Sequence, residues 1–554
     1  MQPRAQSSWL RLFSSGVVCG LALLTMMPNA WCGAEASSSG PAAKSTAEFI
    51  DDQIERSWAD NEIKPSPEAP DEEWVRRVYL DTVGRIPSLK EVETYLADSS
   101  PRKRAVLVDA LLDHPDYVRN FTTIWTNLCM GRADVRRVSR PSLEKFFREA
   151  FAKNRPWNDV VVDIVTAEGH FEENGAVNYI LAQMQLPDDG VQLTAKTTRL
   201  FLGMQVQCTQ CHNHPFNDWQ QSQFWEFNSF FRQVSKRDYR RTDPNSGRQV
   251  DDYSEVVWQD YSGPVHFEKR SGLMEAAYPI YLGRKIDAGP DTDRRKELAR
   301  LLVEPNEGET PLLATAFVNR MWGHFFGYGF TRPVDDIGPH NPASHPALLE
   351  RLAADFASGG YNVRQLVRWI ANSRAYSLTS QLSSDNRVDD PASGEMPLFS
   401  HMYIKSMEAE QLYDSLITAS NADKAGNGGW DAQEAQRRRW MQQFVVTFDN
   451  DENDEATTFN GTIPQALMMM NSDLMERAVS ADRGSLLFEV LNSPGPETQK
   501  IQKLYLAALS RRPGGTEMST ARQFLSAYPA SSGVMAWQDM FWALLNSNEF
   551  ILNH

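Results

Sequence analysis

Two cysteines and two histidines stand close together in the segment Cys208-Thr-Gln-Cys211-His212-Asn-His214. Cysteines separated by two residues and followed directly by histidine have the spacing of a covalent c-type haem site. Each thiol of such a site adds to one vinyl group, and the adjacent imidazole binds the iron. The sequence therefore predicts haem c as the cofactor, with Cys208 and Cys211 as thioether anchors and His212 as the proximal ligand.

The same residues are compatible with two other kinds of site. Zinc favours thiolate and imidazole ligands, so Cys208 and Cys211 with His212 or His214 form an alternative zinc set that needs a further ligand. A disulfide between the two cysteines, either structural or redox-active, is the third interpretation. Haem is favoured over zinc and disulfide, and the second axial haem ligand stays open among Met204, His214, Met321 and His324.

A second group of side chains combines imidazoles with carboxylates: His324, Asp335, Asp336 and His345. Such a group can bind a metal or exchange protons, which gives a third hypothesis, a metal-dependent hydrolase. The favoured interpretation of these residue types is structural: the histidine belongs to a Trp-rich core and the acids cap helix ends. The chain has no P-loop, nucleophile elbow or HExxH motif, so the sequence leaves enzymatic activity undecided.

Apolar and aromatic residues flank the cysteine segment on both sides. They could shield the faces of a porphyrin, but a buried core helix accounts for the aromatic residues equally well and is the favoured interpretation. The residues are Leu200, Phe201, Leu202, Met204 and Val206 before the motif, and Phe224, Trp225, Phe227, Phe230 and Phe231 after it.

The N-terminus has the pattern of a secretion signal. Arg4 and Arg11 provide positive charge, and residues 16–27 form an apolar stretch of about a dozen residues. We therefore expect a signal peptide at residues 1–34, a flexible leader at 35–47, and a location outside the cytoplasm, either periplasmic or at the cell surface. Cysteines in such a compartment usually meet oxidising conditions.

Composition narrows the classes of partner. The chain has 554 residues, 41% hydrophobic and 23% charged, with a formal net charge of -16. Nucleic-acid binding relies on clustered Lys and Arg, which this acidic chain lacks, so we expect no nucleic-acid partner. No apolar run long enough to span a membrane follows the signal, so no span is expected in the mature chain. For an electron-transfer function the partner would be an unidentified redox protein.

Helical periodicity dominates the chain and predicts a mainly α fold. Ser88 and Glu91 have the spacing of a capping box, and Phe121, Trp125 and Cys129 recur on one helix face, which makes Cys129 a core residue. Ser344 is expected to cap a later helix. Between residues 239 and 290 helical periodicity weakens and turn formers increase, which indicates a linker or a small β insertion. The predicted organisation is two helical domains, residues 48–238 and 291–554, joined by this segment.

Several longer motifs resemble two domain families. The first half resembles the planctomycete cytochrome-like domain of unknown function in Arg77-Val-Tyr-Leu-Asp81, in Gly84-Arg-Ile-Pro87 and in the stretch from Phe201 through Cys208, Cys211 and His212 to Phe216. The second half resembles the planctomycete-specific domain that commonly follows it. The motifs that carry this second resemblance are Val318-Asn-Arg-Met-Trp322, Pro333-Val-Asp-Asp336, the run from Pro342 to Leu349, and Trp542-Ala-Leu-Leu.

The resemblance implies an exported protein of planctomycete-type bacteria, with Cys208, Cys211, His212 and His214 as signature residues. It implies little about activity, because both domains are of unknown function. Asn213 and Asn217 stand where the family often has aspartates, so any metal-binding role of those acids would be weakened in this chain.

Overall fold

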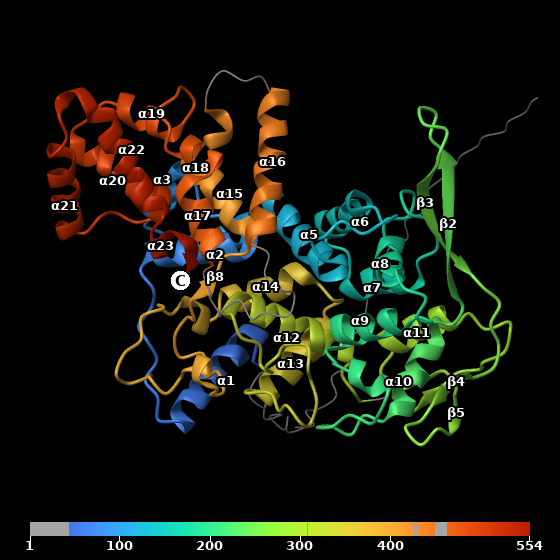
Figure 1. The fold of residues 1–554 in the computed structure, drawn as a ribbon. Helices are drawn as coiled ribbons and strands as arrows, with labels where there is room; N and C mark the ends of the chain where they lie inside the picture. The colour runs from blue at the N-terminus through green and yellow to red at the C-terminus, as the bar shows by residue number, and fades with distance from the viewer. Residues whose placement is uncertain (1–43, 307, 426–429, 449–461) are drawn as a thin grey trace, which may run out of the picture. The chain divides into compact units, whose positions relative to one another are not determined.

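The structure is a computed structural model that describes residues 44–306, 308–425, 430–448 and 462–554. The predicted signal peptide and most of the leader lie outside the described residues. The prediction of a mainly α fold is confirmed, since strands are short and few compared with helices (Figure 1). Within the described ranges, no helix combines the length and apolar character needed to cross a membrane.

The first part of the chain is a succession of helices. The predicted capping box forms: Ser88 precedes α3, its hydroxyl accepts from the amide of Glu91, and the Glu91 carboxylate accepts from the amide of Ser88. Phe121, Trp125 and Cys129 are buried on one face of α5, as the periodicity predicts. The elements are α1 (Thr46–Asp60), α2 (Asp71–Val83), α3 (Leu89–Ala97), α4 (Lys103–Leu112), α5 (Pro115–Met130), α6 (Arg140–Ala152), α7 (Trp157–Thr166), β1 (Gly169–His170), α8 (Val177–Gln183), α9 (Val191–Leu202), η1 (Gln207–Gln210), α10 (Gln221–Asn228) and η2 (Ser229–Phe231).

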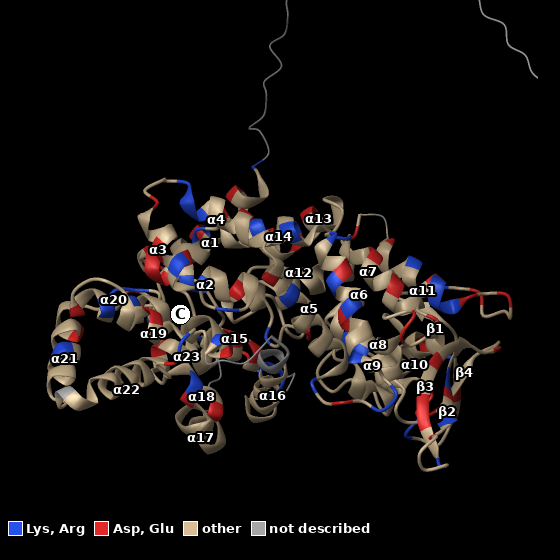
Figure 2. Ribbon diagram, turned by 90° about the horizontal axis from the view of Figure 1, so that it is seen from above, with Lys and Arg blue, Asp and Glu red and all other residues tan. Residues whose placement is uncertain are grey.

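The segment with weak helical periodicity contains strands. β2 (Val234–Thr242) and β3 (Gln249–Trp258) form a long antiparallel hairpin, with β1 on the other side of β3 (Figure 1). Acidic and basic residues are interspersed along this hairpin (Figure 2). Arg137, from the segment before α6, pairs with Asp238 of β2 at 2.5 Å and also with Asp251 of β3. Two smaller antiparallel pairs follow: β4 (Val265–Glu268) with β5 (Met274–Ala277), and β6 (Ile280–Tyr281) with β7 (Arg284–Lys285).

Helices resume after the strands. The helix predicted to begin after Ser344 is α13, and it starts one residue later, with His345 at the N-cap and Pro346 as its first residue. Proline suits that position because the first helical amide has no partner within the helix. The elements are α11 (Arg294–Val303), α12 (Leu312–Phe326), α13 (Pro346–Ser358), α14 (Val363–Ala371), η3 (Ala375–Ser377), η4 (Pro391–Ser393) and β8 (Lys405–Ser406).

The last part of the chain is helical and ends in a short strand that pairs with β8. The elements are α15 (Ala409–Ser420), η5 (Ala422–Lys424), α16 (Trp430–Phe448), α17 (Ile463–Asn471), α18 (Asp473–Ala478), α19 (Leu486–Asn492), α20 (Glu497–Leu509), α21 (Gly515–Ser526), η6 (Ala530–Ser532), α22 (Gly533–Leu545), α23 (Asn548–Ile551) and β9 (Leu552–Asn553).

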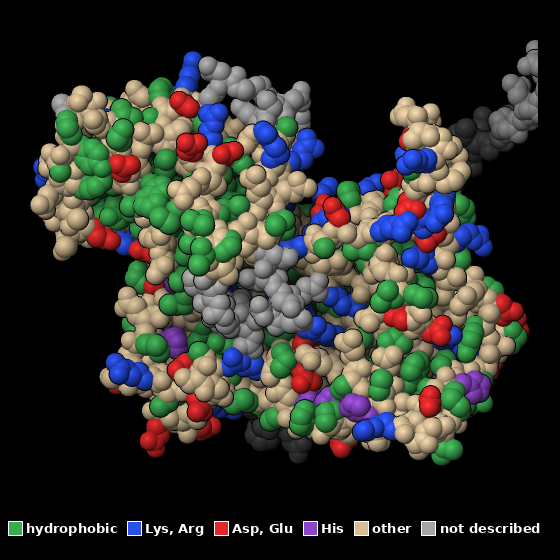
Figure 3. Space-filling view, in the orientation of Figure 1, with side chains coloured by type: hydrophobic (Ala, Val, Ile, Leu, Met, Phe, Trp, Pro, Cys, Tyr) green, Lys and Arg blue, Asp and Glu red, His purple; other side chains and the backbone are tan. Residues whose placement is uncertain are grey.

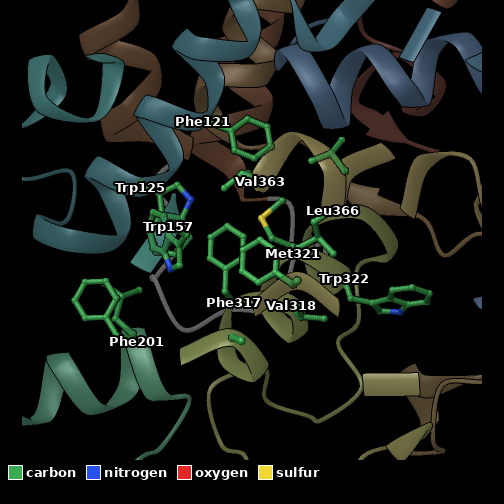
Figure 4. Packing of buried hydrophobic residues seen from close by; sticks show 14 of the residues in the cluster. Phe121, Trp125, Trp157, Phe201, Phe317, Val318, Met321, Trp322, Val363 and Leu366 are labelled. Atoms are coloured by element: carbon green, nitrogen blue, oxygen red, sulfur yellow. The ribbon is translucent and has the colours of Figure 1, made fainter. Parts of the chain in front are cut away.

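The largest hydrophobic cluster combines the helices before and after the strands. Phe317 of α12 stacks on Trp125 of α5, with ring centroids 5.5 Å apart, and contacts Trp157 of α7 at 4.6 Å. Figure 4 shows these three rings directed toward one another, with Phe201 of α9 beside them. Such aromatic pairs contribute about 0.5–1.5 kcal/mol each beyond the area they bury. Residues on both sides of the strand segment therefore share one core, and the predicted domain boundaries stay a prediction.

A second hydrophobic cluster is formed by the helices after β8. It includes residues of α15, α18, α19, α20 and α22, and Leu80 and Ile86 from the first part of the chain join it. The C-terminal helices thus pack on α2 and the turn that follows it.

A buried ion pair lies between α2 and β8. Asp81 is 1% exposed, and its carboxylate accepts from Lys405 Nζ, Tyr376 Oη and Asn553 Nδ2, each at 2.7 Å. Lys405 Nζ also donates to the carbonyls of His324 and Phe325. Because a buried charge is tolerated only when it is paired and hydrogen-bonded, these contacts fix the C-terminal strand to α2.

Candidate functional site

The cysteine segment begins where α9 ends. Gly203 ends the helix with a left-handed backbone (φ +65°), and the next amide, of Met204, returns to the carbonyl of Thr198 at 3.1 Å. Met204 and Val206 then point into the core, with 6% and 2% of their surfaces exposed. These apolar residues before the motif are therefore buried in the protein core.

Cys208 lies on the short 3₁₀ turn η1, and Cys211 is the first residue after it. Thr209, between them, is fully buried and donates from its amide and its hydroxyl to the carbonyl of Val206, at 2.9 and 2.6 Å. Residues three apart on a 3₁₀ turn eclipse one another, so Cys208 and Cys211 share one edge of the turn. Both are exposed and carry free thiols in this structure. The turn therefore presents two reactive groups to the surface.

His212 has one ring nitrogen committed to the backbone. Its Nδ1 lies 2.6 Å from the carbonyl oxygen of Asn213. A carbonyl only accepts hydrogen bonds, so Nδ1 carries the proton and donates, and in the neutral ring Nε2 keeps its lone pair. A histidine that donates its other N–H to a carbonyl has the arrangement common among metal-bound imidazoles. His212 is thus in the tautomer that an iron ligand needs.

His214 is held in the opposite tautomer. Its Nδ1 accepts from the amides of Phe216 and Asn217, at 3.2 and 3.1 Å, so the proton of the neutral ring is on Nε2. Desolvation and the neighbouring His340 lower the pKa of His214, which favours this neutral form. His214 closes the turn structurally, and it could serve as a zinc ligand only after these contacts were broken.

The two asparagines of the loop, Asn213 and Asn217, have structural partners. The side-chain oxygen of Asn213 accepts from the amide of Gln221 at 3.0 Å, and that of Asn217 accepts from the amide of Trp219 at 2.9 Å. A carboxylate oxygen accepts equally well at both positions. The loop therefore retains the contacts that aspartates would make there.

Helix α10 supports the loop from behind. The Gln210 carbonyl accepts from Gln221 Nε2 at 3.2 Å and from Trp225 Nε1 at 3.1 Å. The aromatic residues after the motif belong to the core, as the favoured interpretation stated: Phe224 and Phe230 have no exposed surface. Phe216, in contrast, is 82% exposed beside the histidines.

A segment distant in sequence lies against the cysteine loop. The amide of Ile337 donates to the carbonyl of Gly203 at 2.7 Å, and three residues later the ring of His340 lies 5.9 Å from the ring of His214. His340 Nε2 contacts the Asp336 carboxylate at 2.9 Å, while its Nδ1 is buried without a hydrogen-bond partner. Asp336 is among the candidate residues predicted from the sequence, whereas His340 is not; its spacing of four from Asp336 is the signal that could have indicated it.

Asp336 also influences the first cysteine. Desolvation and, to a smaller extent, the negative charge of Asp336 raise the pKa of the Cys208 thiol. Redox-active Cys-x-x-Cys motifs have the opposite property, a lowered thiol pKa that makes the thiolate available near neutral pH. Cys208 therefore lacks the electrostatic environment of a thioredoxin-like nucleophile.

The other imidazole–carboxylate group does not assemble into one site. His324 is buried and its Nε2 contacts the Asp81 carbonyl at 2.8 Å, whereas Asp335 accepts from Arg199 Nε and Gln205 Nε2, both at 2.7 Å. His345 is buried against other aromatic rings. Over the residues that the structure describes, no three His, Cys, Asp or Glu side chains are arranged to hold a metal ion. The core interpretation accounts for these residues.

An apolar cavity of about 620 Å³ lies apart from the cysteine loop, among α15, α17 and α22. Met407, Leu412, Met469 and Trp542 are among its lining residues, and hydrophobic side chains gather over this region in Figure 3. The described residues that line it include no titratable group, so these side chains have none of the chemistry of the cysteine loop.

Two protein-family models match the chain in succession. PSCyt2, a protein of unknown function (DUF1549), matches residues 49–236, and PSD1, a protein of unknown function (DUF1553), matches residues 294–525. Two families of unknown function thus occur in the order that the sequence motifs predicted. The cysteine loop lies in the first matched segment, and Asp336 and His340 lie in the second. No curated protein and no solved structure matches the chain.

Proposed function

We propose that this chain is an exported c-type haem protein of planctomycete-type bacteria that transfers electrons to or from a partner protein outside the cytoplasm. Cys208 and Cys211 hold the haem through thioether bonds, and His212 is the proximal ligand of the iron. When bound, the haem supplies a one-electron redox centre.

The tautomer of His212 carries this proposal. Its Nδ1 donates to the Asn213 carbonyl, so Nε2 is available to a metal without any rearrangement of the loop. The Nδ1 hydrogen bond also fixes the ring orientation next to Cys211. Of the two motif histidines, His212 alone has this arrangement, since Nδ1 of His214 is occupied as an acceptor.

The position of the thiols supports covalent attachment. Cys208 and Cys211 lie on one edge of a turn, and both are exposed to an incoming group. In thioether formation the sulfur bonds to one vinyl carbon and the thiol proton passes to the other. The addition has no leaving group and needs no external oxidant. Protonated thiols are the reactants of this addition, which agrees with the raised pKa of Cys208.

The exposure of the site supports a role in electron transfer. Both cysteines reach the surface, so one edge of a group bound to them would face solvent and a docking partner. Acidic and basic residues are interspersed along the described part of the chain (Figure 2), which fits a transient protein partner better than a polyanion.

The alternative is a non-redox extracytoplasmic scaffold whose cysteines hold zinc or close a disulfide. The same exposed pair of thiols on one turn is compatible with it. Zinc bound through His214 would require that residue to give up two amide contacts, and zinc bound through His212 would need a further ligand from outside the motif. A catalytic disulfide would require a thiol of lower pKa. A purely structural disulfide is the version that conflicts least with these contacts.

Covalent haem retention tests the proposal. The full chain is produced in an oxidising compartment together with cytochrome c maturation machinery, then denatured, and haem stain and mass are measured. We expect one haem per chain, lost in the Cys208→Ala/Cys211→Ala variant and kept in Cys129→Ala, which alters a buried cysteine outside the motif. A colourless wild-type chain of unmodified mass would reject haem binding, and metal content and thiol titration would then separate zinc from a disulfide.

A further inference from the structure

We infer that a cavity between α1, the end of α13 and the start of α14 binds a neutral sugar, a pyranose with free hydroxyl groups. The cavity measures about 250 Å³ and shares no lining residue with the cysteine loop, so the inference goes beyond the proposed function. Pockets for drug-sized ligands usually enclose about 300–1,000 Å³. This smaller volume suits a single small ring.

Helical spacing brings the polar side chains of α14 to the cavity. Asn362 is the N-cap of α14, and Gln365 and Trp369 follow three and seven residues later, on the same face of the helix. The neighbouring face, which includes Ile370, is buried in the core. Helix α1 packs against both α13 and α14, and its first residue, Thr46, lines the same cavity.

The charged side chain in the described lining is already neutralised. The Asp355 carboxylate accepts from Arg351 Nε at 2.9 and 2.8 Å, and its Oδ2 also accepts from Thr46 Oγ1 at 2.6 Å. Oδ1 takes part in only one of these contacts, so it retains capacity to accept from a ligand hydroxyl. Because no unpaired charge is present among the described lining residues, the cavity favours a neutral ligand over a phosphate, a carboxylate or a zwitterion.

The other polar groups at the cavity have hydrogen-bonding capacity to spare. The side-chain oxygen of Asn362 accepts from Asn154 Nδ2 and from the Gln365 amide, at 2.9 and 3.0 Å, which leaves its NH₂ group free to donate. The Gln365 side chain and Trp369 Nε1 make no hydrogen bond to a described residue. Sugar hydroxyls both donate and accept, so they match this mixture of amide and indole groups. A purely apolar ligand would leave these groups without partners.

Trp369 supplies the apolar part of the site. Its side chain is partly buried and packs against the core, which holds the indole in place at the cavity. The C–H groups of a pyranose lie on the faces of its ring, while the hydroxyls surround the rim. An aromatic ring next to amide and carboxylate groups therefore complements both parts of such a ligand.

Saturation-transfer difference NMR on the full chain tests the inference. The probes are the neutral methyl β-D-glucoside, methyl β-D-galactoside, methyl α-D-mannoside and methyl β-D-xyloside, compared with cyclohexanol as an apolar ring and methyl β-D-glucuronide as an anionic one. We expect saturation transfer to at least one neutral glycoside, stronger on one ring face than on the other, and little to the two comparison compounds.

Two variants place the binding in this cavity. Gln365→Ala removes a side chain without a protein partner, so the fold should be unaffected, whereas Trp369→Ala also removes a partly buried ring and its fold is checked by urea denaturation. Each should weaken glycoside binding about tenfold, as expected for the loss of a hydrogen bond or a ring contact. Trp258→Ala is the control, since Trp258 is 44% exposed and does not line the cavity, and it should leave binding unchanged.

Absence of saturation transfer to all of the neutral glycosides would overturn the inference. Equal transfer to cyclohexanol, or preferred binding of the glucuronide, would overturn it as well, because the ligand would then be apolar or anionic. Glycoside binding that survives both Gln365→Ala and Trp369→Ala would place the sugar elsewhere on the protein. Covalent haem retention is measured separately, so the inference and the proposed function can fail independently.

Discussion

The contact between Gly203 and Ile337 holds the two halves of the candidate site together, and replacing Gly203 by alanine tests it. Gly203 has a left-handed backbone, φ +65°. An added Cβ would lie 2.7 Å from Ile337 Cδ1, 3.2 Å from Ile337 Cγ1 and 3.3 Å from Ala316 Cβ. The substitution therefore combines backbone strain with a steric clash against the segment that carries Asp336 and His340.

The expected cost has two parts. A non-glycine residue in the left-handed region costs about 1–2 kcal/mol. Forcing an extra methyl group into a packed contact adds about 1–3 kcal/mol. Gly360→Ala is the matched control, because Gly360 has φ +75° and nothing within 4 Å of the added Cβ. We expect Gly360→Ala to lose about 1–2 kcal/mol of unfolding free energy and Gly203→Ala about 2–5 kcal/mol.

Urea denaturation followed by tryptophan fluorescence measures both variants. Ile337→Val removes the Cδ1 atom at 2.7 Å, so Gly203→Ala/Ile337→Val should be less destabilised than the sum of the single changes, by about 0.5–3 kcal/mol. Equal losses in the two glycine variants, together with strict additivity at Ile337, would refute the close approach of the two segments.

Four further substitutions test the core, a buried histidine and the exposed ring. Lys405→Met should lower the unfolding free energy in urea by about 3–5 kcal/mol, because it leaves Asp81 buried without its cation; a neutral result would contradict the pairing. Burial lowers the pKa of His345 to about 4, below its ordinary 6.5, so the unfolded chain takes up the proton first and stability is lost as pH falls from 6.5 towards 4. His345→Asn should remove on the order of 1–2 kcal/mol of the difference in unfolding free energy between about pH 7 and about pH 5, and parallel pH profiles would reject this. Phe224→Ala should cost about 3–5 kcal/mol in the same assay and Phe216→Ser less than about 0.5 kcal/mol, whereas similar losses would contradict their opposite exposures.

The sequence predicted what depends on local spacing. The capping box at Ser88, the buried face of α5 and the short strands between the two helical parts all arise from residues near one another in the chain. The motif cysteines and histidines could be named for the same reason. The boundary of α13 moved by one residue because proline at its start competes with the serine cap.

The tautomers of the two motif histidines could not be predicted. They depend on which nearby backbone group faces Nδ1, a carbonyl for His212 and two amides for His214. Both histidines belong to one short loop, and their spacing in the sequence does not show which of them can bind a metal. The folded turn makes one a candidate ligand and the other a structural residue.

The position of His340 beside the cysteine loop could not be predicted because it depends on a contact between distant segments. Its neighbours in sequence include the acids at 335 and 336, and the sequence analysis grouped these with His324 and His345. In the structure Asp335 instead accepts from Arg199, 136 residues away, and only Asp336 contacts His340. Periodicity does not report the contact of Asp335 with Arg199, which arises from the packing of α9 against the segment after α12, whereas the Asp336–His340 contact joins residues four apart in the same segment.

The candidate site requires both matched segments, because each supplies part of it. The cysteine loop follows α9 in the first segment, while Asp336 and His340 follow α12 in the second. The aromatic stack of Trp125 on Phe317 lies between the same two segments and belongs to the largest core. A division of the chain at the strands would therefore separate the two sides of the site and also expose the rings that position them. The hydrophobic core and the cysteine loop thus depend on the same packing of α9 and α12.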